Sequence, residues 1–92
     1  MTATPDYALT LFVSGASDLS ARAIAHAKQL CDSRLEGRYE LTIVDVHEDP
    51  AAAVGSHVVA APTLVRDRPL PVRKLAGELS DPDKVLLALE LG

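Results

Sequence analysis

The sequence predicts an α/β fold with the element order β-α-β-α-β-β-α, and its apolar runs are the main reason. A continuous apolar run at residues 8–13 is followed by an amphipathic helical pattern and by a second run at residues 39–46. Two shorter runs, residues 64–65 and 72–75, flank a proline-bearing connection and predict an antiparallel hairpin. Because 92 residues make one core, we expect a single domain over residues 1–92.

The N-terminal half predicts a parallel βαβ unit. Residues 8–13, ALTLFV, lack polar alternation, which is typical of a central strand covered on both faces. Ser17 can cap the following helix by accepting from the backbone N–H of Ser20, and Gly37 can end it. A strand at residues 39–46 then lies parallel to the first. The helix face that we expect to be buried contains Leu19, Ala23, Ile24, Ala27, Leu30 and Cys31.

Two prolines predict further helix starts. Asp49 can cap a short helix that begins at Pro50 and ends at Gly55. Residues 80–83, SDPD, form a capping-box-like start with Asp in place of Glu or Gln. The segment behind it is apolar enough for a short strand or a helix, and its helical face would contain Val85, Leu86 and Leu89.

The region around Pro62 carries a first resemblance. Ala61-Pro62-Thr63 opens directly into an apolar run, and a sharp reversal is built at least cost at an X-Pro bond. The arrangement of X-Pro-Thr, strand, turn, strand, Gly77 and a capped helix resembles the second half of a thioredoxin-like domain. An ordinary proline turn before an edge strand would explain the triplet equally well.

Composition excludes several classes of function. With only Tyr7, Phe12 and Tyr39 as aromatic residues, a stacking platform for single-stranded nucleic acid is not expected. A net charge of −4 opposes nonspecific DNA binding. No apolar stretch approaches the roughly 20 residues that span a bilayer, and the first residues, MTATPDY, lack a signal-peptide order. We therefore expect a cytoplasmic protein with no nucleic-acid and no membrane partner.

The sequence lacks what a thioredoxin-like oxidoreductase needs. Such an enzyme carries a thiolate at the turn between the first strand and the first helix, and a second cysteine that resolves the mixed disulfide. Residues 14–17, SGAS, occupy that turn, and the only cysteine, Cys31, belongs to the predicted apolar helix face. We therefore predict no catalytic residues. The alternative is a glutathione-binding or thiol-transferase-like small enzyme, in which Ser14 or Ser17 donates its hydroxyl to a bound thiolate.

Neither a metal nor a cofactor is predicted. The histidines His26, His47 and His57 fall on separate elements without metal-ligand spacing. Paired carboxylates such as Glu48 and Asp49 are explained by the charge preference of helix starts. No glycine-rich phosphate loop occurs.

Basic residues gather on the predicted hairpin. They are Arg66, Arg68, Arg73 and Lys74, interrupted only by Asp67. Arg22 can extend this group from the first helix. One interpretation is a solvated hairpin edge, where charges discourage strand addition. The other is a docking patch for an acidic partner, because arginine is favoured in interfaces.

Six short segments together carry a more specific resemblance. They are LTLFVSGAS, VDV at 44–46, APTL at 61–64, PVRK at 71–74, GELS at 77–80 and KVL at 84–86. In combination they resemble the KaiB family, the small clock proteins of the cyanobacterial circadian system, from about Tyr7 to Leu91. The sensory domain of the associated clock histidine kinase is also similar, but matches the hairpin less well.

The resemblance implies a non-enzymatic regulator that binds a KaiC-like ATPase ring and modulates its phosphorylation state. A KaiA-like protein and a clock histidine kinase are the further partners that it implies. It also implies fold switching, in which an often tetrameric ground state repacks its C-terminal half into a monomeric thioredoxin-like form. A homo-oligomer, dimer or tetramer, is therefore expected, and a purely structural homo-oligomer without a ring partner is a third alternative.

The resemblance also assigns individual residues. By position, the residues on the family's partner-binding or switching surface are Tyr7, Arg22, Arg66 and Arg73, and His57 stands where cyanobacterial members often have Lys. Pro62 and Gly77 lie in the half that changes. Ala88 stands at a position that is commonly Gly. Because Ala is favoured over Gly in a helix by roughly 1 kcal/mol, this difference favours the thioredoxin-like form.

Overall fold

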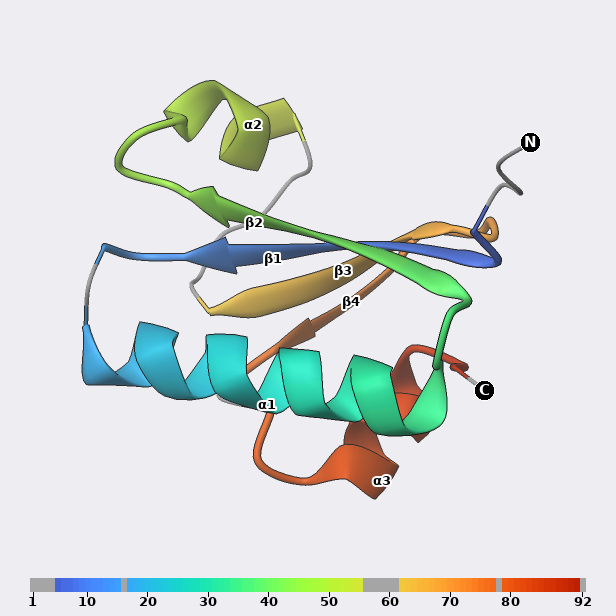
Figure 1. Cartoon of the computed structure of the whole chain (residues 1–92). Helices are drawn as coiled ribbons and strands as arrows, with labels where there is room; N and C mark the ends of the chain where they lie inside the picture. Colours follow the sequence, from blue (N-terminus) through green and yellow to red (C-terminus); the bar gives the residue numbers. More distant parts are fainter. Residues whose placement is uncertain (1–4, 16, 56–61, 78, 92) are drawn as a thin grey trace.

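A computed structural model gives the fold of the chain (Figure 1). It describes residues 5–15, 17–55, 62–77 and 79–91. The elements follow the predicted α/β order: β1 (Tyr7–Val13), α1 (Asp18–Arg34), β2 (Tyr39–Asp45), α2 (Pro50–Gly55), β3 (Thr63–Arg68), β4 (Arg73–Ala76) and α3 (Pro82–Ala88).

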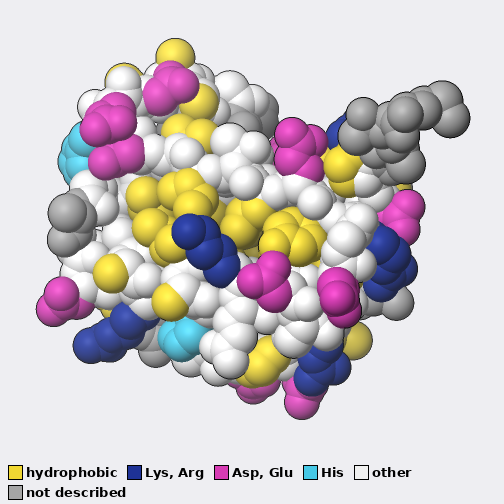
Figure 2. Space-filling model, viewed as in Figure 1, with side chains coloured by type: hydrophobic (Ala, Val, Ile, Leu, Met, Phe, Trp, Pro, Cys, Tyr) yellow, Lys and Arg dark blue, Asp and Glu magenta, His cyan; other side chains and the backbone are white. Residues whose placement is uncertain are grey.

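The four strands form one sheet in the order β2-β1-β3-β4. β1 pairs in parallel with β2, from Tyr7 opposite Tyr39 to Val13 opposite Asp45, as the βαβ pattern predicts. β3 is antiparallel to both β1 and β4, which confirms the predicted hairpin. β2 and β4 are therefore the edge strands. Figure 2 shows hydrophobic side chains, with charged ones among them, along the β2 edge of the sheet, between α1 and α2.

Both faces of the sheet are covered, with α1 and α3 on one side and α2 on the other (Figure 1). Leu9, Leu11 and Val13 of β1 join the cluster that contains the buried residues of α1 and α3. Phe12 lies on the opposite face with Val65, and Ala52 of α2 packs against them. This double coverage explains why the β1 sequence is apolar without alternation.

The start of α1 departs from the predicted apolar face at two residues. Ser17 caps the helix as expected, accepting from the Ser20 backbone N–H at 3.1 Å. Leu19, which we expected in the core, is 51% exposed, whereas Ser20 is buried. The Ser20 hydroxyl lies 2.9 Å from the Ser17 Oγ and 3.4 Å from the Ser14 carbonyl oxygen, so its polar atom keeps partners inside.

The C-terminal segment forms a helix, and its cap lies one residue later than the capping-box pattern suggested. Asp81 is the N-cap, and its carboxylate accepts from the Lys84 backbone N–H at 3.3 Å. Because proline is preferred at the first helical position, Pro82 places the cap at Asp81 and not at Ser80. Val85 and Leu89 are buried in the main core. Within the described ranges, no helix is both long and apolar enough to cross a membrane.

Candidate partner-binding site

Pro62 and Gly77 lie on either side of the open end of the β3–β4 hairpin. Pro62 is buried, and its carbonyl oxygen accepts from the Gly77 backbone N–H at 2.9 Å, next to the opposed pair Thr63 and Ala76. Gly77 has φ +130°, a conformation that side-chain-bearing residues rarely adopt. Two of the three predicted fold-determining residues therefore meet directly. The third, Ala88, is the last residue of α3.

The basic residues of the hairpin divide between the two faces of the sheet. Arg66 is directly opposite Leu9 of the main core and also opposite Arg73, so both arginines face α1 and α3. Lys74 is opposite Val65, which belongs to the cluster on the α2 side. The four cations therefore do not form one patch on one face. Arg73 and Lys74 come together only at the exposed edge strand β4.

Arg66 lies in the interior, which corrects its assignment to an exposed patch. Its side chain is 3% exposed. Nη1 donates to the Leu89 carbonyl oxygen at 2.8 Å and to the Glu90 carbonyl oxygen at 3.4 Å, and Nη2 donates to the Pro71 carbonyl oxygen at 2.7 Å. No sequence pattern marks main-chain acceptors so far along the chain, so sequence reasoning missed this role. Arg66 therefore holds segments together instead of facing solvent.

Arg73 is the more accessible of the opposed pair. Its Nη2 lies 3.3 Å from the Glu90 Oε1, and its side chain is 42% exposed. Glu90 also approaches Arg66, with 3.8 Å between Oε2 and Nη1. Glu90, which the sequence analysis did not single out, therefore lies between one buried and one exposed arginine.

Arg68 and Lys74 lie on the other side of the sheet. Ala8 is directly opposite both Arg68 and Glu40, and the two long side chains meet over it with 4.0 Å between Nη2 and Oε2. The Arg68 side chain is 50% exposed, and Lys74 is exposed on β4. The cations that solvent reaches on or next to the hairpin are thus Arg68, Arg73 and Lys74.

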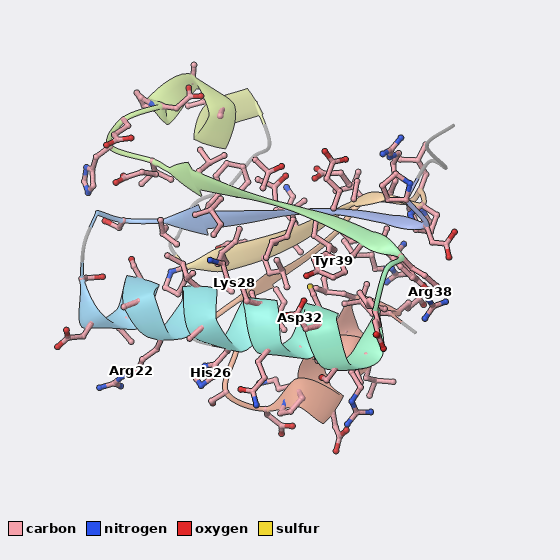
Figure 3. The ribbon with its side chains drawn as sticks, viewed as in Figure 1. Arg22, His26, Lys28, Asp32, Arg38 and Tyr39 are labelled. Atoms are coloured by element: carbon pink, nitrogen blue, oxygen red, sulfur yellow. The ribbon has the colours of Figure 1, made fainter. Side chains whose placement is uncertain are left out.

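The remaining predicted partner-binding residues come from other elements. Tyr7 is half-buried at the start of β1, and the Arg38 guanidinium carbon lies 6.0 Å from its ring centroid. Arg22 is exposed in the first half of α1 and points away from the sheet (Figure 3). His57 lies outside the described residues.

A hydrogen bond joins the end of α1 to the start of β2. Tyr39 donates its hydroxyl to the Asp32 carboxylate at 2.5 Å, and the two residues lie next to each other (Figure 3). This hydrogen bond, followed by partial burial, raises the pKa of Tyr39 to about 12. The contact holds the βαβ half together close to Tyr7, since Tyr39 is the β2 partner of Tyr7.

The turn that carries the reactive thiol in thioredoxin-like enzymes is occupied by hydroxyl groups that already have partners. The Ser14 Oγ lies 2.8 Å from the His47 Nε2, and the Ser17 hydroxyl caps α1. Asp45 accepts from the backbone N–H groups of His47 at 2.8 Å and Gly15 at 3.3 Å, and the bond from His47 is the main cause that lowers the Asp45 pKa. His47 and Asp45 were not predicted to meet this turn.

Cys31 has the environment of a core residue. It is fully buried, and burial, followed by the neighbouring Asp32 charge, raises the pKa of its thiol to about 11. A thiolate is therefore disfavoured at neutral pH. Among the residues that the structure describes, no three or more His, Cys, Asp or Glu side chains are grouped so that they could hold a metal ion.

Comparison with known proteins decides the family. The model of the KaiB domain matches residues 10–91. This chain belongs to the KaiB family. The circadian clock oscillator protein KaiB of Synechococcus elongatus is 40% identical over 85 residues, which cover 92% of this chain and 83% of the relative. The KaiB of Prochlorococcus marinus strain MIT 9515 is 38% identical over 91 residues, covering 99% and 84%.

Solved structures show that this KaiB-family chain has a thioredoxin-like fold. The N-terminal domain of Synechococcus elongatus SasA superposes with a TM-score of 0.77 at 23% identity, covering 98% of this chain and 88% of that one. Mitochondrial thioredoxin 3 of Saccharomyces cerevisiae gives a TM-score of 0.74 at 20% identity, covering 94% and 78%. Both resemblances that the sequence suggested, to the KaiB family and to thioredoxin-like domains, are confirmed.

Proposed function

We propose that this KaiB-family protein is a non-enzymatic clock regulator that binds a KaiC-like ATPase ring and modulates the phosphorylation state of that ring. The observation that carries the proposal is its 40% identity, over 92% of the chain, to a protein named circadian clock oscillator protein KaiB. A KaiA-like protein or a clock histidine kinase would be further partners, and the protein would act in the cytoplasm.

The edge strand β4 is the centre of the proposed docking surface. Arg73 and Lys74 are exposed there on opposite faces, and Arg68 lies at the end of the neighbouring strand β3. Tyr7 and Arg22 extend the surface from β1 and α1, and His57 remains a predicted member. Arginine suits such a surface because its planar guanidinium can bind a partner's carboxylate with two hydrogen bonds. Arg66 would support the surface from inside.

Fold switching would decide when this surface is presented. The βαβ half, residues 8–46, would stay constant, while the half that contains Pro62, Gly77 and Ala88 would repack. The helical form of α3 and the presence of Ala at position 88 favour the thioredoxin-like state as the resting form. A dimer or tetramer would belong to the alternative packing.

Retention on an immobilised KaiC-like ring in the presence of ATP tests the docking surface. Arg73→Glu should reduce retention at least about tenfold, because it places a negative charge where an acidic partner would bind. Lys28→Glu is the matched control, since Lys28 is exposed on α1 and its substitution changes the charge by the same amount. Equal retention of the wild type and Arg73→Glu would reject this surface.

If even the wild-type chain is not retained, the proposed partner itself is wrong. In that case light scattering across a range of concentrations would test the alternative of a structural homo-oligomer.

A further inference from the structure

The buried Arg66 guanidinium connects two segments that the sheet alone does not hold together. One is the β3–β4 connection, where the Pro71 carbonyl oxygen accepts a hydrogen bond from the guanidinium. The other is the turn after α3, where the carbonyl oxygens of Leu89 and Glu90 accept. The last carbonyls of a helix lack partners within the helix, and they lie at the negative end of its dipole. A guanidinium at this place therefore donates hydrogen bonds to carbonyl oxygens that have no donor within α3.

The turn after α3 has a strained backbone at the point where Arg66 binds it. Glu90 has φ +52°, a conformation that few residues other than glycine adopt. The turn is closed by the Leu91 backbone N–H, which donates to the Leu86 carbonyl oxygen at 2.9 Å. Such a backbone conformation persists where surrounding contacts fix it, and the two carbonyl contacts of Arg66 are contacts of this kind.

Ion pairs with exposed side chains also connect α3 and the turn after it to the rest of the chain. Arg73 of β4 lies 3.3 Å from Glu90, with side chains that are 42% and 58% exposed. Arg34 of α1 lies 3.8 Å from Asp83, but their side chains are 50% and 88% exposed. An ion pair this exposed contributes little to stability. Val85 and Leu89 supply the apolar contacts. Within the described part of the chain the Arg66 Nε–H has no acceptor, so both of its terminal nitrogens, and not this atom, secure the guanidinium.

We propose that Arg66 is a latch that holds α3 on the sheet, so that removing this one side chain releases α3 as a unit while the βαβ half stays folded. Lysine cannot replace it, because the latch needs two diverging nitrogens, one toward Pro71 and one toward Leu89, and an ammonium group is a single point. The proposal concerns the isolated chain and does not depend on any partner.

Backbone NMR chemical shifts of the isolated protein test the latch. In Arg66→Met the secondary chemical shifts that mark residues 82–88 as helical should fall below about half of their wild-type values. The secondary chemical shifts that mark β1 and β2 as strands should persist. Arg66→Lys should show the same selective loss. Arg68→Met is the matched control, since Arg68 lies on the same strand but is exposed, and it should keep all helical shifts of α3.

Two results would overturn the latch. One is full helical shifts in α3 of Arg66→Met, and the other, where Arg66→Met does not fold, is an unchanged or a uniformly changed spectrum of Arg66→Lys. If Arg66→Met does not fold at all, Arg66→Lys decides by the same criterion: a selective loss in α3 supports the latch, and an unchanged or a uniformly changed spectrum rejects it.

Discussion

At the scale of single residues, arginine has two roles on this hairpin, and burial separates them. Arg66 is 3% exposed and donates to main-chain carbonyls, whereas Arg68 and Arg73 are about half exposed and pair with carboxylates. An exposed ion pair contributes only about 0–1 kcal/mol, so in the proposed complex a partner's carboxylate would replace Glu90 on Arg73 with little loss. Substitution of an exposed arginine should therefore affect binding, and substitution of Arg66 should affect the fold.

The hydrogen bond between Tyr39 and Asp32 should make the protein sensitive to alkaline pH. The phenol has a pKa of 10.0 without the contact and about 12 within the fold. Because the folded state keeps the proton that the unfolded state loses, this contribution to stability is complete below pH 10 and disappears as the pH rises through 12.

Urea denaturation at several pH values between 9.5 and 12 would measure this effect. Tyr39→Phe should weaken the decrease in the free energy of unfolding over that range, and Asp32→Asn should do the same because it removes the carboxylate acceptor. The buried Cys31 thiol, with a pKa of about 11, contributes a decrease of the same sign in all three proteins. Identical slopes for the wild type and both variants would contradict the assignment to Tyr39.

Single residues are also where the sequence is least informative. The Ser17 cap could be predicted, because its acceptor and donor lie three residues apart. The burial of Ser20 in place of Leu19 could not be predicted. It depends on a hydrogen bond to the Ser14 carbonyl oxygen, which lies before the helix and so outside the helical pattern. The burial of Arg66 depends on acceptors 23 and 24 residues away, and charge alone suggested an exposed side chain.

At the scale of elements, local patterns predicted the order of the helices and strands in the described part of the chain, because each begins or ends at a recognisable signal. α2 begins at Pro50 and ends at Gly55, as expected. For the last segment the sequence left the element type open, because residues 85–91 are apolar enough for a strand as well as for a helix. Only the packing of Val85 and Leu89 against the main core shows that the helix is the form adopted in this structure.

α3 should respond to a single glycine. Ala88→Gly removes a favourable helix residue worth up to roughly 1 kcal/mol, so α3 should be populated less and the proposed alternative packing of the C-terminal half more. Backbone NMR shifts of residues 82–88, together with light scattering for the oligomeric state, would show this change. Ala25→Gly in α1 is the control: it makes the same change on an exposed helix position in the half that is proposed to stay constant.

A selective decrease of the α3 helical shifts in Ala88→Gly, with no such selectivity in Ala25→Gly, is the expected outcome. If both variants leave α3 unchanged, position 88 does not set the balance between the two proposed packings.

At the scale of the whole molecule, this is a thioredoxin-like fold whose usual reactive position has no thiol. The turn before α1 contains no sulfur, and the one cysteine is buried at the far end of that helix with a raised pKa. The whole-molecule interpretation could be reached from the sequence because it depends on which residue types are present. The sequence could not show which cations share a face of the sheet, since that depends on the register of β3 with β4.

The same arrangement predicts that the protein does not bind glutathione. A glutathione site at this turn would need a hydroxyl that is available to a thiolate, but Ser17 caps α1 and Ser14 is held by His47 at 2.8 Å. We expect no retention of the purified chain on immobilised glutathione, and Ser14→Ala should behave like the wild type. Retention of the wild type that Ser14→Ala abolishes would instead restore the small-enzyme alternative. A negative result in this assay would leave the exposed edge of β4, the centre of the proposed docking surface, as the site to test first.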